Sequence, residues 1–246
     1  MGLEIALFIV GFLIFLVGIV SGVTSLWLVV KYFRYNRREN SLGLTGIEIA
    51  RKILDDNGLE HIKVKRTGSL LFGNSYSHYF KKVRLRGLIR HETSLTSIGI
   101  GAQKAALAIL DKEGDPDMKR RIRLVPIITF GPFAFIPLIL AGFALDYFVF
   151  GATSGTCTMI LGAVGLLFYV YSIVLAVMTL KTERKAQEKA YDILQYDYNI
   201  TPEELDALKE VFRLYNIQYI NDIILSSLEL IYTILQILIS VKGKSN

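Results

Sequence analysis

Residues 5–30 form an apolar run that contains no charged side chain. A run of this length can cross the hydrocarbon core of a bilayer with some tilt. No basic segment precedes it and no A-x-A cleavage pattern follows it, so it predicts an uncleaved membrane anchor. The mean hydropathy of +0.42 and the 52% hydrophobic content also exceed those of ordinary soluble domains. We therefore expect a membrane protein.

Three further apolar runs follow, at Leu124–Leu145, Thr156–Leu180 and Ile223–Val241. The first of them contains three prolines, which predict kinks in a membrane helix: Pro126, Pro132 and Pro137. Polar residues interrupt or adjoin the last run, namely Asn221, Asp222 and Glu229, so it predicts either a fourth span or a helix on the membrane surface. We favour a span, with the C-terminus outside.

Basic residues lie on one side of these runs. Of the 28 Lys and Arg residues, all but Lys242 and Lys244 fall in segments 31–123 and 181–213. Cytoplasmic loops of membrane proteins carry an excess of Lys and Arg, so this pattern predicts a multi-pass plasma-membrane protein with its N-terminus outside and its main soluble part in the cytoplasm. The same topology explains the net charge of +6 without nucleic acid as a partner.

The expected fold is a mainly α membrane protein with about four transmembrane helices and a small α+β cytoplasmic part between the first and second spans. Five segments follow from this organisation. They are an N-terminal transmembrane anchor at 1–33, a cytoplasmic α+β region at 34–123, a transmembrane hairpin at 124–180, a cytoplasmic helical region at 181–216 and a C-terminal hydrophobic helix at 217–246.

The α+β region begins with a capping box at Thr45–Glu48, which predicts a helix that ends at Asn57–Gly58. Apolar and basic residues alternate at 62–65 and again at 82–86, so two short strands are expected, with a polar loop at Gly68–Tyr79 between them. The basic sides of these strands could face anionic lipid headgroups or only solvent.

Segment Ser97–Gly114 is apolar on most sides and ends in glycine, so it predicts a central, largely buried helix. A charged helix is expected at 181–195. The sequence Thr201-Pro202-Glu203-Glu204 then predicts the start of another helix, which can run without a break into the last apolar run.

Residues with catalytic potential are few. The three histidines, His61, His78 and His91, do not form a His-Glu-x-x-His helix, and neither a P-loop nor a G-x-S-x-G elbow is present. The single Cys157 lies in an apolar run, which excludes a disulfide framework and a cysteine-based metal site.

The order of these parts resembles that of the YugP-type membrane zinc metallopeptidases. The most specific similarity is the stretch Gly43–Leu59, which reads GLTGIEIARKILDDNGL. Weaker similarities lie at Lys82–Leu85, Glu113–Gly114, Leu124–Pro126, Glu183–Ala186 and Thr201–Leu205. The resemblance covers nearly the whole chain from about residue 40.

The resemblance also marks a departure. Members of that family carry His-Glu-x-x-His on the central helix, and aligned through Glu113–Gly114 those positions read Gln103-Lys104-Ala105-Ala106-Leu107 here. Both histidine ligands and the catalytic Glu are then missing, although Glu183 resembles the family's third ligand. One carboxylate does not hold zinc, so we expect no catalytic residues, no metal and no other cofactor, with Gln103, Lys104, Leu107 and Glu183 as a degenerate site.

Lys104 and Glu183 would both point into the vacated site. We therefore expect an ion pair that joins the central helix to the helix after the third span. Removing only one partner of such a buried pair would strongly destabilise the fold. The alternative is that Lys104 reaches water and Glu183 is an ordinary surface charge.

The sequence thus favours a pseudopeptidase that acts as a structural or regulatory subunit, in contact with the bilayer and with a protein partner or further copies of itself. Glycines at 131, 142, 162 and 165 permit close helix packing between chains or within one chain. One alternative is an active peptidase whose zinc site is completed by His78 or His91 with Glu183, or by a partner. Another is a transporter or lipid-handling protein that uses Asp222 and Glu229.

Overall fold

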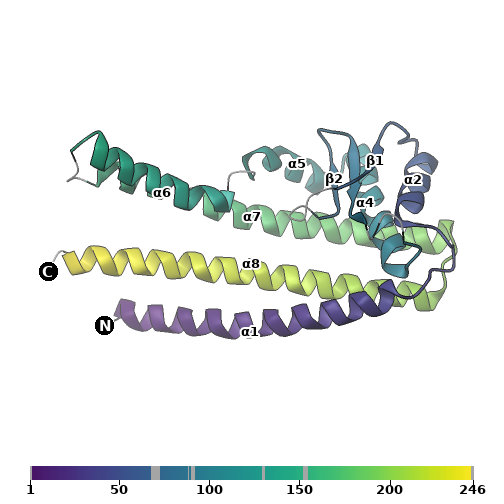
Figure 1. Ribbon diagram of the computed structural model, residues 1–246, viewed down its shortest axis with the longest axis horizontal. Helices are drawn as coiled ribbons and strands as arrows, with labels where there is room; N and C mark the ends of the chain where they lie inside the picture. Colours follow the sequence, from purple (N-terminus) through teal and green to yellow (C-terminus); the bar gives the residue numbers. More distant parts are fainter. Residues whose placement is uncertain are drawn as a thin grey trace. The chain divides into compact units, whose positions relative to one another are not determined.

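The structure is a computed structural model that describes residues 2–67, 73–87, 89, 92–128, 131–151 and 155–244 (Figure 1). Its elements in chain order are α1 (Gly2–Asn36), α2 (Gly46–Asp56), β1 (Lys63–Arg66), β2 (Ser75–Ser77), β3 (Lys82–Leu85), α4 (Leu95–Glu113), α5 (Pro116–Ile128), α6 (Gly131–Phe148), α7 (Thr156–Asp192), a π-helical turn (Ile193–Asp197) and α8 (Pro202–Lys244). The predicted mainly α class with a small sheet is confirmed.

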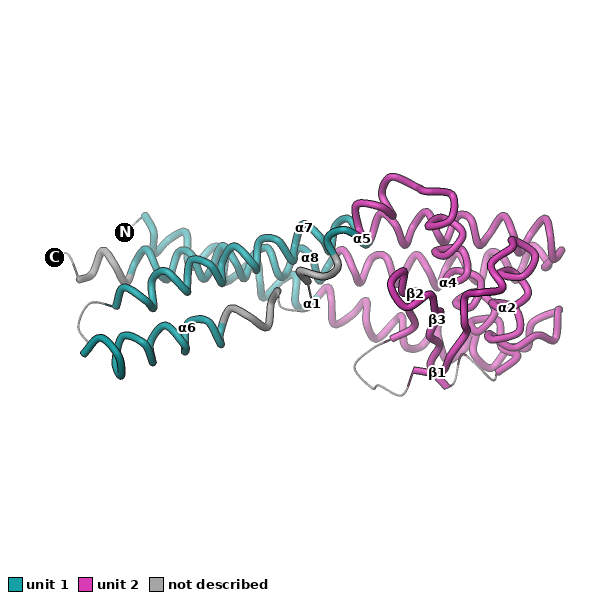
Figure 2. The backbone as a smooth tube through the Cα atoms, turned by 90° about the horizontal axis from the view of Figure 1, so that it is seen from above, with its two compact units in different colours: residues 1–19, 123–179, 221–246 teal, residues 20–122, 180–220 magenta. Residues whose placement is uncertain are grey.

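The chain forms two compact units, and each combines segments that are distant in the sequence (Figure 2). Unit 1 contains residues 1–19, 123–179 and 221–246, and unit 2 contains residues 20–122 and 180–220. Three long helices therefore each contribute to both units: α1, α7 and α8.

Three helices in the described part are long and apolar enough to cross a bilayer: Gly2–Asn36, Thr156–Asp197 and Pro202–Ile239. The second expected span, Leu124–Leu145, is divided between α5 and α6, and residues 129 and 130 lie outside the described part. The apolar helix described there, Ile136–Phe148, is shorter, so a fourth span stays a prediction.

Within unit 1, α6 and α7 approach closely at Gly142. A Cβ atom there would lie 2.6 Å from the Cα atom of Thr158, so only glycine allows this packing. The Asp146 carboxylate accepts hydrogen bonds from the backbone N–H groups of Cys157 and Thr158, at the start of α7. Gly142 therefore serves packing within the chain.

The sheet of unit 2 has the strand order β1-β3-β2. β1 pairs with β3 in parallel, and β2 pairs with β3 in the antiparallel direction. The expectation of two strands and a loop at Gly68–Tyr79 was wrong in part, because β2 lies inside that segment. β2 has only one buried residue, Tyr76, so its polar sequence Ser-Tyr-Ser carries little strand signal.

The core of unit 2 forms where α2 and α4 pack against the sheet (Figure 1). The predicted capping box of α2 is present, since the Thr45 and Glu48 side chains each bind the other's backbone N–H. Helices α2 and α4 meet at Gly101, where a Cβ atom would lie 2.4 Å from the Gly46 carbonyl oxygen. This contact fixes α2 on α4.

Candidate functional site

Helix α4 carries the segment on which the functional interpretation depends. Ser94 caps its start by accepting a hydrogen bond from the Ser97 N–H, and Gly114 ends it in the left-handed conformation. Every residue from Leu95 to Leu110 is buried. Polar side chains in the middle of this helix must therefore find partners within unit 2.

Glu183 supplies that partner. It lies on α7, three residues beyond the apolar run that ends at Leu180. Its Oε2 atom lies 2.7 Å from Lys104 Nζ, and it accepts a hydrogen bond from Gln103 Nε2 at 3.0 Å. The ion pair expected between Lys104 and Glu183 is thus present, and Lys104 does not extend to water.

Arg121 on α5 completes this cluster, which we call the Glu183 cluster: Gln103, Lys104, Arg121 and Glu183. The Arg121 Nη2 atom lies 3.3 Å from Glu183 Oε1. Sequence reasoning missed this residue because Arg121 belongs to the basic run before an apolar segment, where membrane topology already explains it.

The electrostatics of the Glu183 cluster favour the ionised carboxylate. Burial raises the pKa of Glu183, but the charges of Lys104 and Arg121 and their hydrogen bonds outweigh it, so that pKa is lower than usual. Arg121 Nη1 is buried without a hydrogen-bond partner among the described residues. Two cations and one anion leave the cluster with a formal charge of +1.

Zinc does not fit this cluster. Both carboxylate oxygens of Glu183 already contact cations, and the side chain beside them is an amide. Zinc sites use thiolates, imidazoles and carboxylates, and a net positive cluster repels a divalent cation. Leu107, which the resemblance aligns with the second histidine of the motif, is fully buried in the apolar core. Within the described residues no group of three or more His, Cys, Asp or Glu side chains could hold a metal ion.

Of the two described histidines, neither forms an ion pair or a hydrogen bond with Glu183. His78 follows β2, and its Nδ1 lies 2.6 Å from Asp111 Oδ2 on α4. The same carboxylate accepts a hydrogen bond from the Tyr76 hydroxyl at 2.6 Å. His61 is exposed, and His91 lies outside the described residues. The expected alternative of a site formed by His78 and Glu183 thus gains no support.

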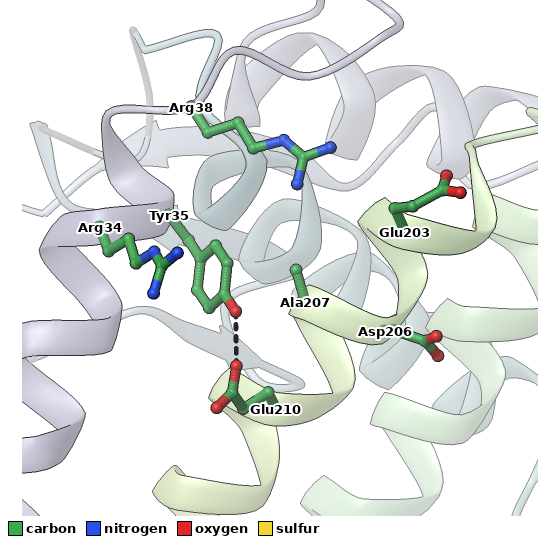
Figure 3. A pocket seen from close by; sticks show the side chains of 7 residues that line it. All are labelled: Arg34, Tyr35, Arg38, Glu203, Asp206, Ala207 and Glu210. Carbon is green, nitrogen blue, oxygen red and sulfur yellow. Dashed lines mark hydrogen bonds between the residues drawn. The ribbon is translucent and has the colours of Figure 1, made fainter.

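A mixed-charge pocket of about 530 Å³ lies between α1 and α8 in unit 2. Figure 3 shows Arg34 on α1, Arg38 just after the end of α1 at Asn36, and the carboxylates on α8. Glu210 forms a salt bridge with Lys31 at 2.7 Å and accepts a hydrogen bond from Tyr35. The remaining charged lining residues are Arg34, Arg38, Glu203 and Asp206. The Glu210 carboxylate therefore already binds a cation and a hydroxyl donor at the edge of this pocket.

A second pocket, of about 350 Å³, lies in unit 1 and includes Glu229. The Tyr169 hydroxyl donates a hydrogen bond to this carboxylate at 3.3 Å. Asp222, the other acidic residue of the transporter hypothesis, does not line this pocket. Glu229 therefore lies in a cavity that Asp222 does not share.

Comparison with known proteins identifies the scaffold. Residues 9–238 match the family described as "Putative neutral zinc metallopeptidase". The chain is also similar to the "Putative membrane protease YugP" of Bacillus subtilis (strain 168), with 24% identity over 201 residues that cover 82% of this chain and 84% of that protein. No solved structure matches the chain. Because the family match runs from α1 into α8, the chain belongs to this family of neutral zinc metallopeptidases and is a membrane protein.

Proposed function

We propose that this chain is a catalytically inactive homologue of a membrane-embedded zinc metallopeptidase. The observation that carries the proposal is the Glu183 cluster, in which Lys104 and Arg121 occupy both oxygens of the carboxylate. A metallopeptidase needs open metal coordination and a general base beside the bound water. Here a lysine stands where the resemblance implies the base.

Metal analysis of the protein purified in mild detergent tests this proposal. We expect far less than one zinc per chain, because the cluster offers one carboxylate and repels divalent cations. The triple variant Gln103→His/Lys104→Glu/Leu107→His serves as the positive control, since it restores two imidazoles and a carboxylate beside Glu183. Near-stoichiometric zinc in the unaltered chain, or cleavage of a peptide by it, would contradict the proposal.

We further propose that the chain acts as a structural or regulatory subunit of a membrane protein complex. Its topology in this proposal is multi-pass, with the N-terminus outside and unit 2 in the cytoplasm. The gathering of Lys and Arg in segments 31–123 and 181–213 supports that orientation. A family scaffold whose core is kept while its site is altered is suited to binding without catalysis.

Purification in mild detergent, followed by identification of co-eluting proteins, tests the subunit role. We expect a membrane protein, or further copies of this chain, at a constant ratio through affinity and size-exclusion steps. A single copy that migrates alone in every mild detergent would contradict this role while leaving the loss of catalysis intact.

The alternative function is an active membrane metallopeptidase with a non-standard or partner-completed site. It requires zinc and at least one ligand besides Glu183. The carboxylate would first have to release Lys104 and Arg121, so the observed contacts favour the inactive form.

A further inference from the structure

The outer face of the sheet in unit 2 is strongly basic. β1 and β3 place Lys63 opposite Lys82 and Lys65 opposite Arg84. On the other side of β3, Val83 and Leu85 are buried in the core. We call the four cations Lys63, Lys65, Lys82 and Arg84 the basic sheet face.

The positive charge of this face is not balanced within the described part of the chain, where none of the four cations pairs with a carboxylate. Like charges directly opposite each other destabilise a sheet. The pKa of Lys82 is lowered by partial burial and by the charges of Arg84 and Lys65. An external anion would relieve this repulsion.

The turn between β2 and β3, residues 78–81, adds exposed aromatic rings beside these cations. Tyr79 is 56% exposed and Phe80 is 67% exposed. The Phe80 ring centroid lies 4.4 Å from Lys82 Nζ and 5.9 Å from Arg84 Cζ. Such a mixture of exposed aromatic and basic side chains is typical of the membrane–water interface.

The turn is held in place from its inner side. Asp111 on α4 binds His78 at 2.6 Å, and Lys81 Nζ lies 3.6 Å from the same carboxylate. Lys81 adopts a positive φ of 45°, a conformation that few non-glycine residues adopt. Contacts within unit 2 thus hold the turn that carries the exposed rings, which lowers the entropy lost when the turn binds another surface.

The contacts of the 78–81 turn indicate that it lies close to the start of an apolar run. The Tyr79 hydroxyl donates a hydrogen bond to the Ile122 carbonyl at 3.0 Å. Two residues later, the Leu124 carbonyl accepts a hydrogen bond at 3.2 Å from Tyr171, which lies in the apolar run of α7. The turn is therefore anchored at Ile122, two residues before the apolar run that begins at Leu124.

We propose that the basic sheet face and the 78–81 turn bind anionic phospholipid headgroups, with Phe80 in the interfacial layer. Phosphate groups supply the missing counter-charge, and adjacency to Ile122 favours a lipid surface over an acidic protein or nucleic acid. This inference does not depend on the loss of peptidase activity.

Tryptophan fluorescence of the full chain in lipid nanodiscs tests the proposal. Trp27→Phe removes the single native tryptophan, and Phe80→Trp places a reporter in the exposed turn. Discs contain phosphatidylcholine alone or an equimolar mixture with phosphatidylglycerol. We expect emission at shorter wavelength, and quenching by brominated lipid, in the anionic discs. High salt should weaken both effects because it screens the headgroup attraction.

Charge removal in the same reporter background sharpens the test. Lys82→Gln/Arg84→Gln should lower the ratio of quenched to unquenched reporter in anionic discs by about fivefold for each cation removed. Lys52→Gln/Lys209→Gln is the matched control, since it removes the same charge from exposed positions on α2 and α8 and should have no effect. Circular dichroism checks that all variants keep their helices.

Two outcomes would overturn the inference. One is equal emission and quenching in both kinds of disc, which would show that the turn does not prefer anionic headgroups. The other is the same response from Lys82→Gln/Arg84→Gln and from the control pair, which would show that the basic sheet face does not make the contact.

Discussion

Two acidic clusters lie on α4, one at Lys104 and the other at Asp111, seven residues further along the helix. The surroundings of their carboxylates differ. Glu183 lies on α7 and is held by the cations of Lys104 and Arg121. Asp111 lies on α4 itself and is held by the Tyr76 hydroxyl and the His78 ring. Seven residues are about two turns, so both clusters lie along one stripe of the helix.

The comparison shows how one helix is joined to two other parts of unit 2. The Glu183 cluster ties α4 to α5 and α7 through ion pairs between largely buried groups. Asp111 ties α4 to β2 and the β2–β3 turn through two hydrogen bonds and a longer contact with the half-exposed Lys81. Breaking the first leaves two buried cations without a counter-charge, whereas breaking the second weakens contacts that are partly open to solvent. The first loss is expected to be larger.

Glu183→Gln should give the largest effect. It leaves Lys104 and Arg121 buried together without a counter-charge, so we expect a loss of about 3–5 kcal/mol in the free energy of unfolding. Thermal unfolding in detergent measures it. Glu113→Gln, at a more exposed pair with Lys189, is the control and should cost about 1 kcal/mol or less. Similar losses in the two variants would show that the Glu183 cluster is not effectively buried.

The coupling free energy between Lys104 and Glu183, measured by a double-mutant cycle, should be the next largest effect. Lys104→Met and Glu183→Gln remove the two ends of the shortest ion pair in the cluster. Because the partners touch, their combined loss should be smaller than the sum of the single losses by about 1–3 kcal/mol. Additive losses would mean that Arg121, and not Lys104, supplies most of the attraction to Glu183.

Asp111→Asn should have a smaller effect. The amide oxygen can still accept from the Tyr76 hydroxyl and the His78 ring, which both contact Asp111 Oδ2, but the acceptor loses its charge and Lys81 loses a counter-charge at 3.6 Å. We expect a loss of about 1–2 kcal/mol in unfolding free energy, measured in the same detergent. Asp55→Asn, which removes a half-exposed i,i+4 pair with Arg51, is the control with an expected loss of about 0.5 kcal/mol or less. A loss as large as that of Glu183→Gln would remove the distinction between the clusters.

A change of pH near neutrality should have the smallest effect on the free energy of unfolding. The folded-state pKa values of Asp111 and Glu183 both lie below their ordinary values of 3.8 and 4.5. For Asp111, burial raises the pKa but the Tyr76 and His78 hydrogen bonds outweigh it. The unfolded chain therefore takes up protons first, so this stability is complete above the ordinary pKa values and is lost as pH falls through the lowered ones.

Unfolding curves between pH 8 and pH 3 measure this dependence. Stability from these two groups should stay constant down to about pH 5 and then fall. Each of the variants Glu183→Gln and Asp111→Asn should flatten the acid part of the curve. A variant whose acid loss equals that of the unaltered chain would show that the carboxylate in question has no lowered pKa.

Local signals predicted much of the fold. The sequence predicts the capping box at Thr45, the glycine end of α4 at Gly114 and the Thr201 start of α8, because caps depend on residues within one turn of each other. The continuous helix from Pro202 through the last apolar run was also expected. β2 was missed because its pairing with β3, and not its own sequence, makes it a strand.

The candidate site was predicted in part. The meeting of Lys104 and Glu183 followed from the family resemblance, which aligned both residues with one ancestral site. Arg121 could not be predicted in the same way, since it lies in a basic run that topology alone explains. The clamp of Asp111 on the 78–81 turn was likewise missed, because His78 and Asp111 are far apart in the sequence.

By itself the sequence determined the apolar helices, their caps and the absence of the metal-binding motif, because each depends on residue types within a short window. Only the tertiary structure decided that Arg121 joins Lys104 on Glu183, and that Tyr76 and His78 bind Asp111. These contacts join segments that are distant in the sequence, so they arise only when α4 is packed inside unit 2.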